Sequence, residues 1–138
     1  MLAMKILTYS CLLFSGFTKS KFESYRKRYK LNNLVEIHHL IPRQHKNHPV
    51  ILNCNYNIED GYNFQFLPTK LGFSKLNLHN NRPIHEKGHY KYNLFIKDYL
   101  DYLYLSDKYS SQDLIELNKF LRKNMRDFDQ ISKMASDE

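Results

Sequence analysis

Cysteine, glycine, proline and tryptophan are all scarce in this chain of 138 residues. It has two cysteines, Cys11 and Cys54, four glycines, four prolines and no tryptophan. Two cysteines outside any CxxC pair are too few for a disulfide scaffold. Scarce glycine and proline argue against a disordered or loop-dominated chain. No apolar run reaches the roughly 20 residues that span a membrane, so we expect no stable membrane association.

The N-terminal segment has two possible interpretations. An apolar stretch from residue 6 to residue 17, interrupted by polar residues, follows a single early lysine. It fits a short helix that packs on the core. It also fits a weak signal peptide without a clear small-x-small cleavage site. Localisation therefore stays open between the cytoplasm and secretion as a toxin, and we favour the packed helix.

Charge is unevenly distributed. Residues 1–100 hold fifteen Lys and Arg against six Asp and Glu, a net charge of +9, whereas residues 101–138 carry a net charge of −2. The basic part of the chain also holds all seven histidines. A basic surface points to an anionic partner, for which nucleic acid is the commonest candidate.

The hydrophobic pattern predicts a single domain of the α+β class. Residues 19–30 read as a basic helix whose aromatic stripe faces the core, and residues 34–41 and 62–67 read as strands. The segments 43–61 and 69–82 read as loops, the first with room for one helical turn. Residues 83–105 and about 110–128 read as helices. We divide the chain into a basic helical extension (1–30), a core (31–105) and a C-terminal helix with an acidic tail (106–138).

The histidines form a candidate metal site. His38 and His39 end the first strand, where adjacent side chains point to opposite faces. His85 and His89 are spaced i,i+4, so on a helix they share a face and can chelate one divalent ion. His38 can supply a third ligand, and His39 is then free of the metal. Three protein ligands with an open position are typical of a catalytic rather than a closed structural site. We interpret the remaining histidines, His45, His48 and His79, as exposed loop residues.

Three segments in this order, IHHLIP, YNFQFLP and HEKGHYKYN, resemble the HNH nucleases and, among them, the AHH group. The segment NIEDGYN resembles the family's lead-in to the second motif. The resemblance covers about residues 34–96. This chain departs from the family pattern at Ile37, where the family has Ala, and at Phe64, where it usually has Gly; the second change bears on the backbone turn at Asn63. The matching positions are His38-His39 with Pro42, Asn63 with Leu67-Pro68, and His85 and His89 with Tyr90 and Tyr92.

The resemblance implies a ββα-metal fold and hydrolysis of phosphodiester bonds in DNA, with RNA as a second candidate. His39 would take a proton from water, and Asn63 would hold His39 by a hydrogen bond. One divalent ion, Mg²⁺, Mn²⁺, Zn²⁺ or Ni²⁺, would lie on His38, His85 and His89 and contact the phosphate and the leaving oxygen. Phosphate contacts without sequence readout would come from nearby basic residues. These are Arg43, Lys46, Lys70, Lys75, Arg82 and Lys87.

Two other interpretations remain open. The histidines can hold a structural zinc in a nucleic-acid-binding module that does not cut, although such a site has no use for a histidine that faces away from the metal. Alternatively, the chain is a plain helical protein with incidental histidines. An acidic immunity or inhibitor protein is the partner expected if the chain is a toxin. The helices at both ends either complete the core or form a dimer.

Overall fold

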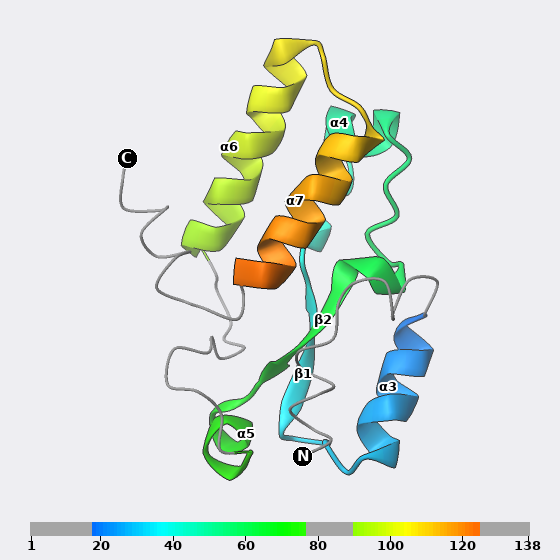
Figure 1. Ribbon diagram of the computed structural model, residues 1–138, viewed down its shortest axis with the longest axis vertical. Helices are drawn as coiled ribbons and strands as arrows, with labels where there is room; N and C mark the ends of the chain where they lie inside the picture. The colour runs from blue at the N-terminus through cyan, green and yellow to red at the C-terminus, as the bar shows by residue number, and fades with distance from the viewer. Residues whose placement is uncertain (1–17, 77–89, 125–138) are drawn as a thin grey trace.

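Helices surround a two-stranded sheet in the computed structural model, which describes residues 18–76 and 90–124. Five α-helices, two short 3-10 helices (η1 and η2) and two strands lie in these ranges, so the predicted α+β class is confirmed. Figure 1 shows α6 and α7 side by side above the strands and α3 beside them. In chain order the elements are α3 (Lys19–Arg28), β1 (Val35–His39), η1 (Arg43–His45), α4 (Pro49–Asn53), η2 (Gly61–Asn63), β2 (Phe64–Pro68), α5 (Lys70–Lys75), α6 (Tyr90–Ser106) and α7 (Ser111–Asn124).

The two strands pair antiparallel, as the ββα core requires. The register runs from Val35 opposite Pro68 to His39 opposite Phe64. Residues 40–63 connect the strands and contain η1, α4 and η2. A two-stranded sheet is marginal by itself in water, so packing on both faces must stabilise it.

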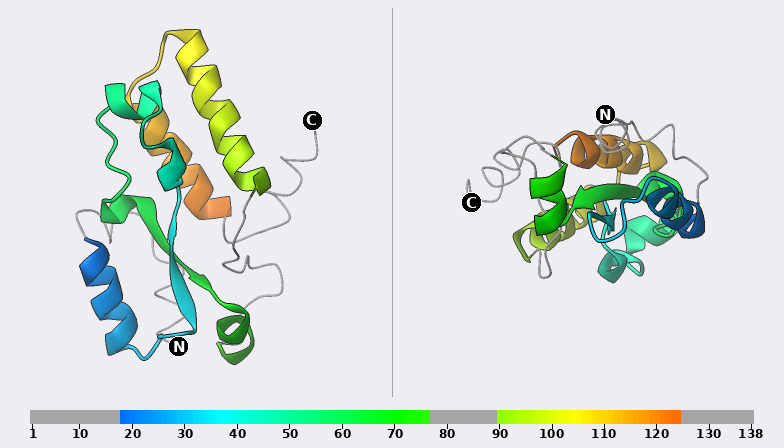
Figure 2. Two further views of the ribbon diagram at one scale, coloured as in Figure 1. Left: turned by 180° about the vertical axis from the view of Figure 1, so that it is seen from behind. Right: turned by 90° about the horizontal axis from the view of Figure 1, so that it is seen from below.

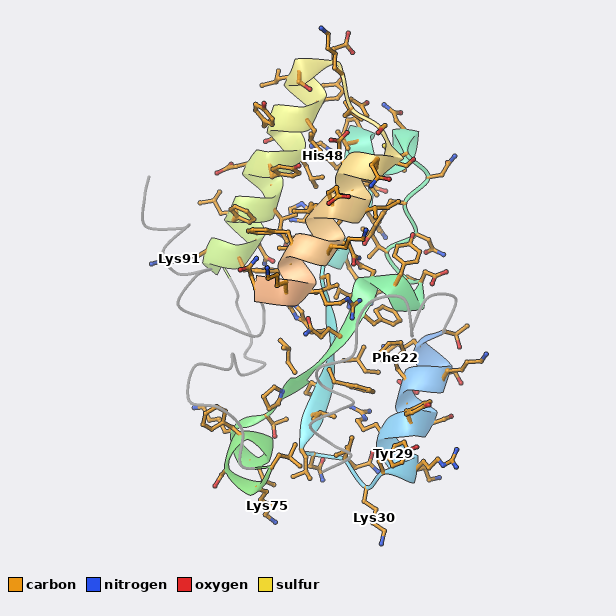
Figure 3. The ribbon with its side chains drawn as sticks, in the orientation of Figure 1. Phe22, Tyr29, Lys30, His48, Lys75 and Lys91 are labelled. Carbon is orange, nitrogen blue, oxygen red and sulfur yellow. The ribbon has the colours of Figure 1, made fainter. Side chains whose placement is uncertain are left out.

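One face of the sheet packs against α3. Phe22 of α3 is buried, and its ring lies 5.4 Å from that of Phe64 and 5.1 Å from that of Phe66. Figure 3 shows Phe22 pointing from α3 toward the sheet. Tyr25 and Tyr29 pack against the same cluster, so the prediction that the aromatic stripe faces the core is confirmed.

The other face supports the larger core. Leu40, just after β1, and Leu67 of β2 pack in one hydrophobic cluster with residues of α4, α6 and α7. Each fully buried Leu or Ile stabilises the fold by roughly 1.5–3 kcal/mol. Figure 2 shows the sheet between α3 and the pair α6 and α7. The C-terminal helix α7 therefore completes this core, through its buried residues Leu114, Leu117 and Leu121.

A short helix replaces part of a predicted loop. Residues 69–82 were expected to be irregular, but α5 occupies Lys70–Lys75. Thr69 Oγ1 caps it by accepting a hydrogen bond from Gly72 N at 3.0 Å, as N-cap threonines do. Gly72 packs so closely on Leu34 that a Cβ atom there would overlap the Leu34 carbonyl oxygen. Six residues are too few to show a helical period, which explains the wrong prediction.

The described parts of the two long helices, α6 and α7, match the helices predicted from the sequence. The described part of α6 ends at Ser106, one residue beyond the predicted end, and α7 begins at Ser111. Residues 83–89 and 125–128, the remaining parts of these two predictions, lie outside the described residues, as does the whole segment 1–17. None of the described helices is long and apolar enough to cross a membrane.

Two loop histidines are structural, contrary to prediction. His45 is buried in η1, and this burial lowers its pKa. His48 caps α4: its Nδ1 accepts a hydrogen bond from Val50 N at 3.2 Å, and its Nε2 lies 2.9 Å from Asp101 Oδ1 on α6. Figure 3 shows His48 beside α6. Both residues help fix the long connection to α6. His79 lies outside the described residues.

Candidate active site

His38 and His39 point to opposite faces of the sheet, as predicted. His38 is buried, and its ring lies 5.4 Å from that of Tyr92 on α6. His39 lies on the α3 face, where its ring meets Phe64 edge-on at 4.9 Å. The His39 side chain keeps 18% of its surface exposed, enough for water to reach it. The pair therefore presents one imidazole to the helical core and one to a partly open surface.

His39 is paired with an acidic residue that the sequence analysis did not single out. Its Nε2 lies 3.2 Å from Glu59 Oε2 in the long connection. Partial burial lowers the pKa of His39, and the nearby charges of Arg43 and Lys19 lower it further, although Glu59 acts in the opposite direction. With a pKa below its usual value of 6.5, His39 is mainly neutral at pH 7.

Glu59 joins His39 to Arg43. Its Oε1 lies 2.8 Å from Arg43 Nε while its Oε2 faces His39. Partial burial tends to raise the pKa of Glu59, but the hydrogen bond with His39 and the surrounding positive charges outweigh burial and lower it. Glu59 is therefore ionised and can only accept hydrogen bonds. This assigns the His39 hydrogen to Nε2 and leaves the lone pair on Nδ1.

The Asn63 side chain is hydrogen-bonded to the backbone and not to His39. It ends η2, one residue before β2, instead of lying on the strand as predicted. Its Oδ1 accepts hydrogen bonds from Ile41 N at 2.9 Å and Tyr56 Oη at 2.7 Å. Its Nδ2 donates to Ile41 O at 3.0 Å and Ile58 O at 2.9 Å. These four bonds use the whole amide, so the predicted hydrogen bond to His39 is wrong.

The structure brings only part of the predicted phosphate-contact set to His39. Arg43 is linked to His39 because both residues contact the carboxylate of Glu59. Lys46 is exposed and follows η1 directly. Lys70 and Lys75 lie on α5, at the end of the sheet where Val35 meets Pro68, about 13 Å of strand away from His39. Figure 3 shows Lys75 at this lower end. The last two residues of the set, Arg82 and Lys87, lie outside the described residues.

The metal ligands are described only in part. His85 and His89 lie outside the described residues, and no group of three or more His, Cys, Asp or Glu that could hold a metal occurs within 18–76 and 90–124. His38, the third predicted ligand, is a buried imidazole facing α6, the helix that follows His85 and His89 in the chain. By its chemistry, a set of three imidazoles fits a divalent transition metal.

Replacing Asn63 tests its backbone role. Asn63→Ala removes the partners of three buried backbone groups, so we expect the free energy of unfolding to fall by about 3 kcal/mol or more. Asn57→Ala is the matched control, since Asn57 Oδ1 accepts one hydrogen bond, from exposed Glu59 N, and we expect a loss of about 1 kcal/mol or less. Urea denaturation measures both losses, and equal losses would contradict this role.

The family of the chain follows from comparison with known proteins. A family model described as AHH, a nuclease family of the HNH/ENDO VII superfamily with conserved AHH, matches residues 21–128. This chain keeps both histidines of that motif but has Ile37 in place of the alanine. Searches of curated proteins and of solved structures gave no significant match. The match covers most of the chain, including most of α3 and all of α7, and the chain belongs to the AHH nuclease family of the HNH/ENDO VII superfamily.

Proposed function

We propose that this nuclease is a metal-dependent endonuclease that hydrolyses phosphodiester bonds in DNA, and in RNA as a second substrate, with little sequence preference. Membership of a nuclease family supports the reaction class. The observation that carries the mechanism is the pair of adjacent histidines on opposite faces, with neutral His39 hydrogen-bonded to Glu59. A site that only held a structural metal would not need the second histidine.

His39 is the general base of this proposal. Glu59 accepts the hydrogen of Nε2, so Nδ1 presents its lone pair and can take a proton from the attacking water. The positive charge that then develops on the imidazole is stabilised by the Glu59 carboxylate. The edge-on contact with Phe64 fixes the plane of the ring. Asn63 does not contact the reacting water in this proposal; it fixes the backbone that follows His39.

The proposed metal site uses His38, His85 and His89. Imidazole ligands favour Zn²⁺ or Ni²⁺ in affinity, whereas Mg²⁺ or Mn²⁺ remain candidates for turnover. A divalent ion bound there would neutralise charge on the phosphate and on the leaving oxygen. His38 is buried against Tyr92, and this packing favours a fixed orientation of the His38 ring.

Substrate contacts are proposed for Arg43 beside Glu59, for Lys46 just after η1, and for Lys70 and Lys75 at the far end of the sheet. Arg43 is 68% exposed and is held by Glu59, so a phosphate would compete with that carboxylate for it. Such contacts position the backbone of the nucleic acid but do not read bases. An acidic inhibitor protein that covers this basic surface is a further proposed partner.

Plasmid nicking by the purified chain tests the function. We expect cleavage with at least one of Mg²⁺, Mn²⁺, Zn²⁺ and Ni²⁺ and none with EDTA. His39→Ala should lower the rate by about 10²-fold or more, because a general base contributes at least that factor.

The matched control is His48→Asn, which replaces a histidine outside the site by another good N-cap residue and should leave the rate unchanged. Retention of DNA in a gel shift without cleavage under any metal would refute the nuclease and favour a binding module.

Glu59→Gln should change catalysis and binding in opposite directions. It keeps the shape of the side chain but removes the charge that stabilises protonated His39, so we expect kcat to fall by about tenfold. It also removes a negative charge beside the phosphate and frees Arg43, so we expect DNA to bind more tightly at low salt.

Glu36→Gln is the control, since its side chain is equally exposed, at 48%, but is paired with Arg26 away from His39. Single-turnover kinetics and fluorescence anisotropy give the two values. An unchanged kcat in Glu59→Gln would exclude a role for this carboxylate in the reaction.

A further inference from the structure

Two polar side chains of α7 reach the loop that carries Asn63. Arg122 Nη2 donates to Tyr62 O at 2.8 Å and to Phe64 O at 2.9 Å, the carbonyl groups on either side of Asn63. Asn118 Nδ2 donates to Tyr62 O at 2.8 Å and lies 2.7 Å from Tyr56 Oη. Helix α7 therefore holds the backbone on both sides of Asn63.

These bonds continue without a break to the backbone that follows His39. Tyr56 Oη, in contact with Asn118, donates to Asn63 Oδ1, which also accepts from Ile41 N. The Asn63 backbone carbonyl accepts from Leu40 N at 2.8 Å. Displacement of α7 or loss of its polar side chains would therefore loosen the segment that fixes His38 and His39.

The burial of these groups shows that they do more than cover the core. Asn118 is 2% exposed and Arg122 is 4% exposed, next to leucines that cover the core by apolar contact alone. Burial of a guanidinium among leucines is costly unless hydrogen bonds compensate it, and an apolar residue of similar size would often stabilise the fold as well or better. Polar residues at these two positions are best explained by the geometry they impose on the loop.

A second connection reaches the same segment from α6. Tyr92 Oη donates to Leu40 O, and the Tyr92 ring lies beside His38. Burial raises the pKa of the Tyr92 hydroxyl, so this group stays protonated and donates the hydrogen bond. The segment 38–41 is therefore held by α6 through Tyr92 and by α7 through the loop that carries Asn63.

We infer that Asn118 and Arg122 are positioning residues of the active site, and that α7, outside the ββα core, holds the Asn63 loop so that His38 and His39 keep their working orientations. This inference rests on the proposed function for its catalytic part. Its structural part, that α7 fixes the loop, can be tested without any nuclease activity.

The test compares Asn118→Ala and Arg122→Met with Leu114→Ala in the full chain. Leu114 is fully buried on the same helix, in the hydrophobic core, so its truncation destabilises the fold without removing a bond to the loop. Arg122→Lys is a second variant that keeps the charge but replaces the planar guanidinium fork, in case Arg122→Met does not fold. All assays run well below the lowest melting temperature of the set.

Two readouts separate positioning from stability. The first is hydrogen exchange at Leu40 N and Ile41 N, the two amides bonded to Asn63, compared with Leu100 N inside α6. The second is the pair of kinetic parameters kcat and KM for DNA cleavage, measured separately. We expect Asn118→Ala and Arg122→Met to speed exchange at Leu40 and Ile41 relative to Leu100. We expect kcat to fall by up to about 10²-fold, as for a small misplacement of catalytic groups, with KM nearly unchanged.

Leu114→Ala should lower the melting temperature at least as much, speed exchange without this local bias, and keep kcat within about threefold, because it leaves the geometry of the site intact. Unchanged exchange at Leu40 and Ile41 in the two variants, or faster exchange with unchanged kcat, would overturn the inference. If the wild-type chain does not cleave, the proposed function fails, and exchange alone then decides whether α7 holds the loop.

Discussion

The whole site depends on one buried side-chain amide. Asn63 makes four hydrogen bonds, two of them to the backbone of Ile41, and so joins the start of β2 to the residues that follow β1. The strand pair has only two members and gives little rigidity of its own. Without this amide, Leu40 would keep its backbone bonds to Asn63 and to Tyr92, but Ile41 would lose both of its bonds to Asn63, and the two imidazoles would be held less rigidly.

The two imidazoles differ because the sheet has two different faces. His38 lies against Tyr92 in the larger core, where a fixed ring suits a ligand. His39 lies on the face covered by α3, at an open edge where Glu59 reaches it. The proposed division of labour, with a ligand on one side and a base on the other, thus follows from the alternation of side chains along a strand.

Local patterns predicted much of this and long-range contacts explain the rest. Alternation placed the strands and the opposite directions of His38 and His39, and helical spacing placed α3, α6 and α7. The pairing of Glu59 with His39 joins residues 20 positions apart, and Arg122 meets Phe64 across 58 positions. No periodicity carries such information. The segment NIEDGYN did contain Glu59, so a search of its charged residues for partners of His39 could have suggested this pair.

The most direct measurement is calorimetric titration of the purified chain, of His38→Ala and of His39→Ala with Ni²⁺ or Zn²⁺. We expect one bound ion per chain, lost or greatly weakened in His38→Ala and retained in His39→Ala, because the two side chains face opposite sides of the sheet. Loss of the ion in His39→Ala, or its undiminished binding by His38→Ala, would contradict the assignment of one histidine to the metal and the other to the water.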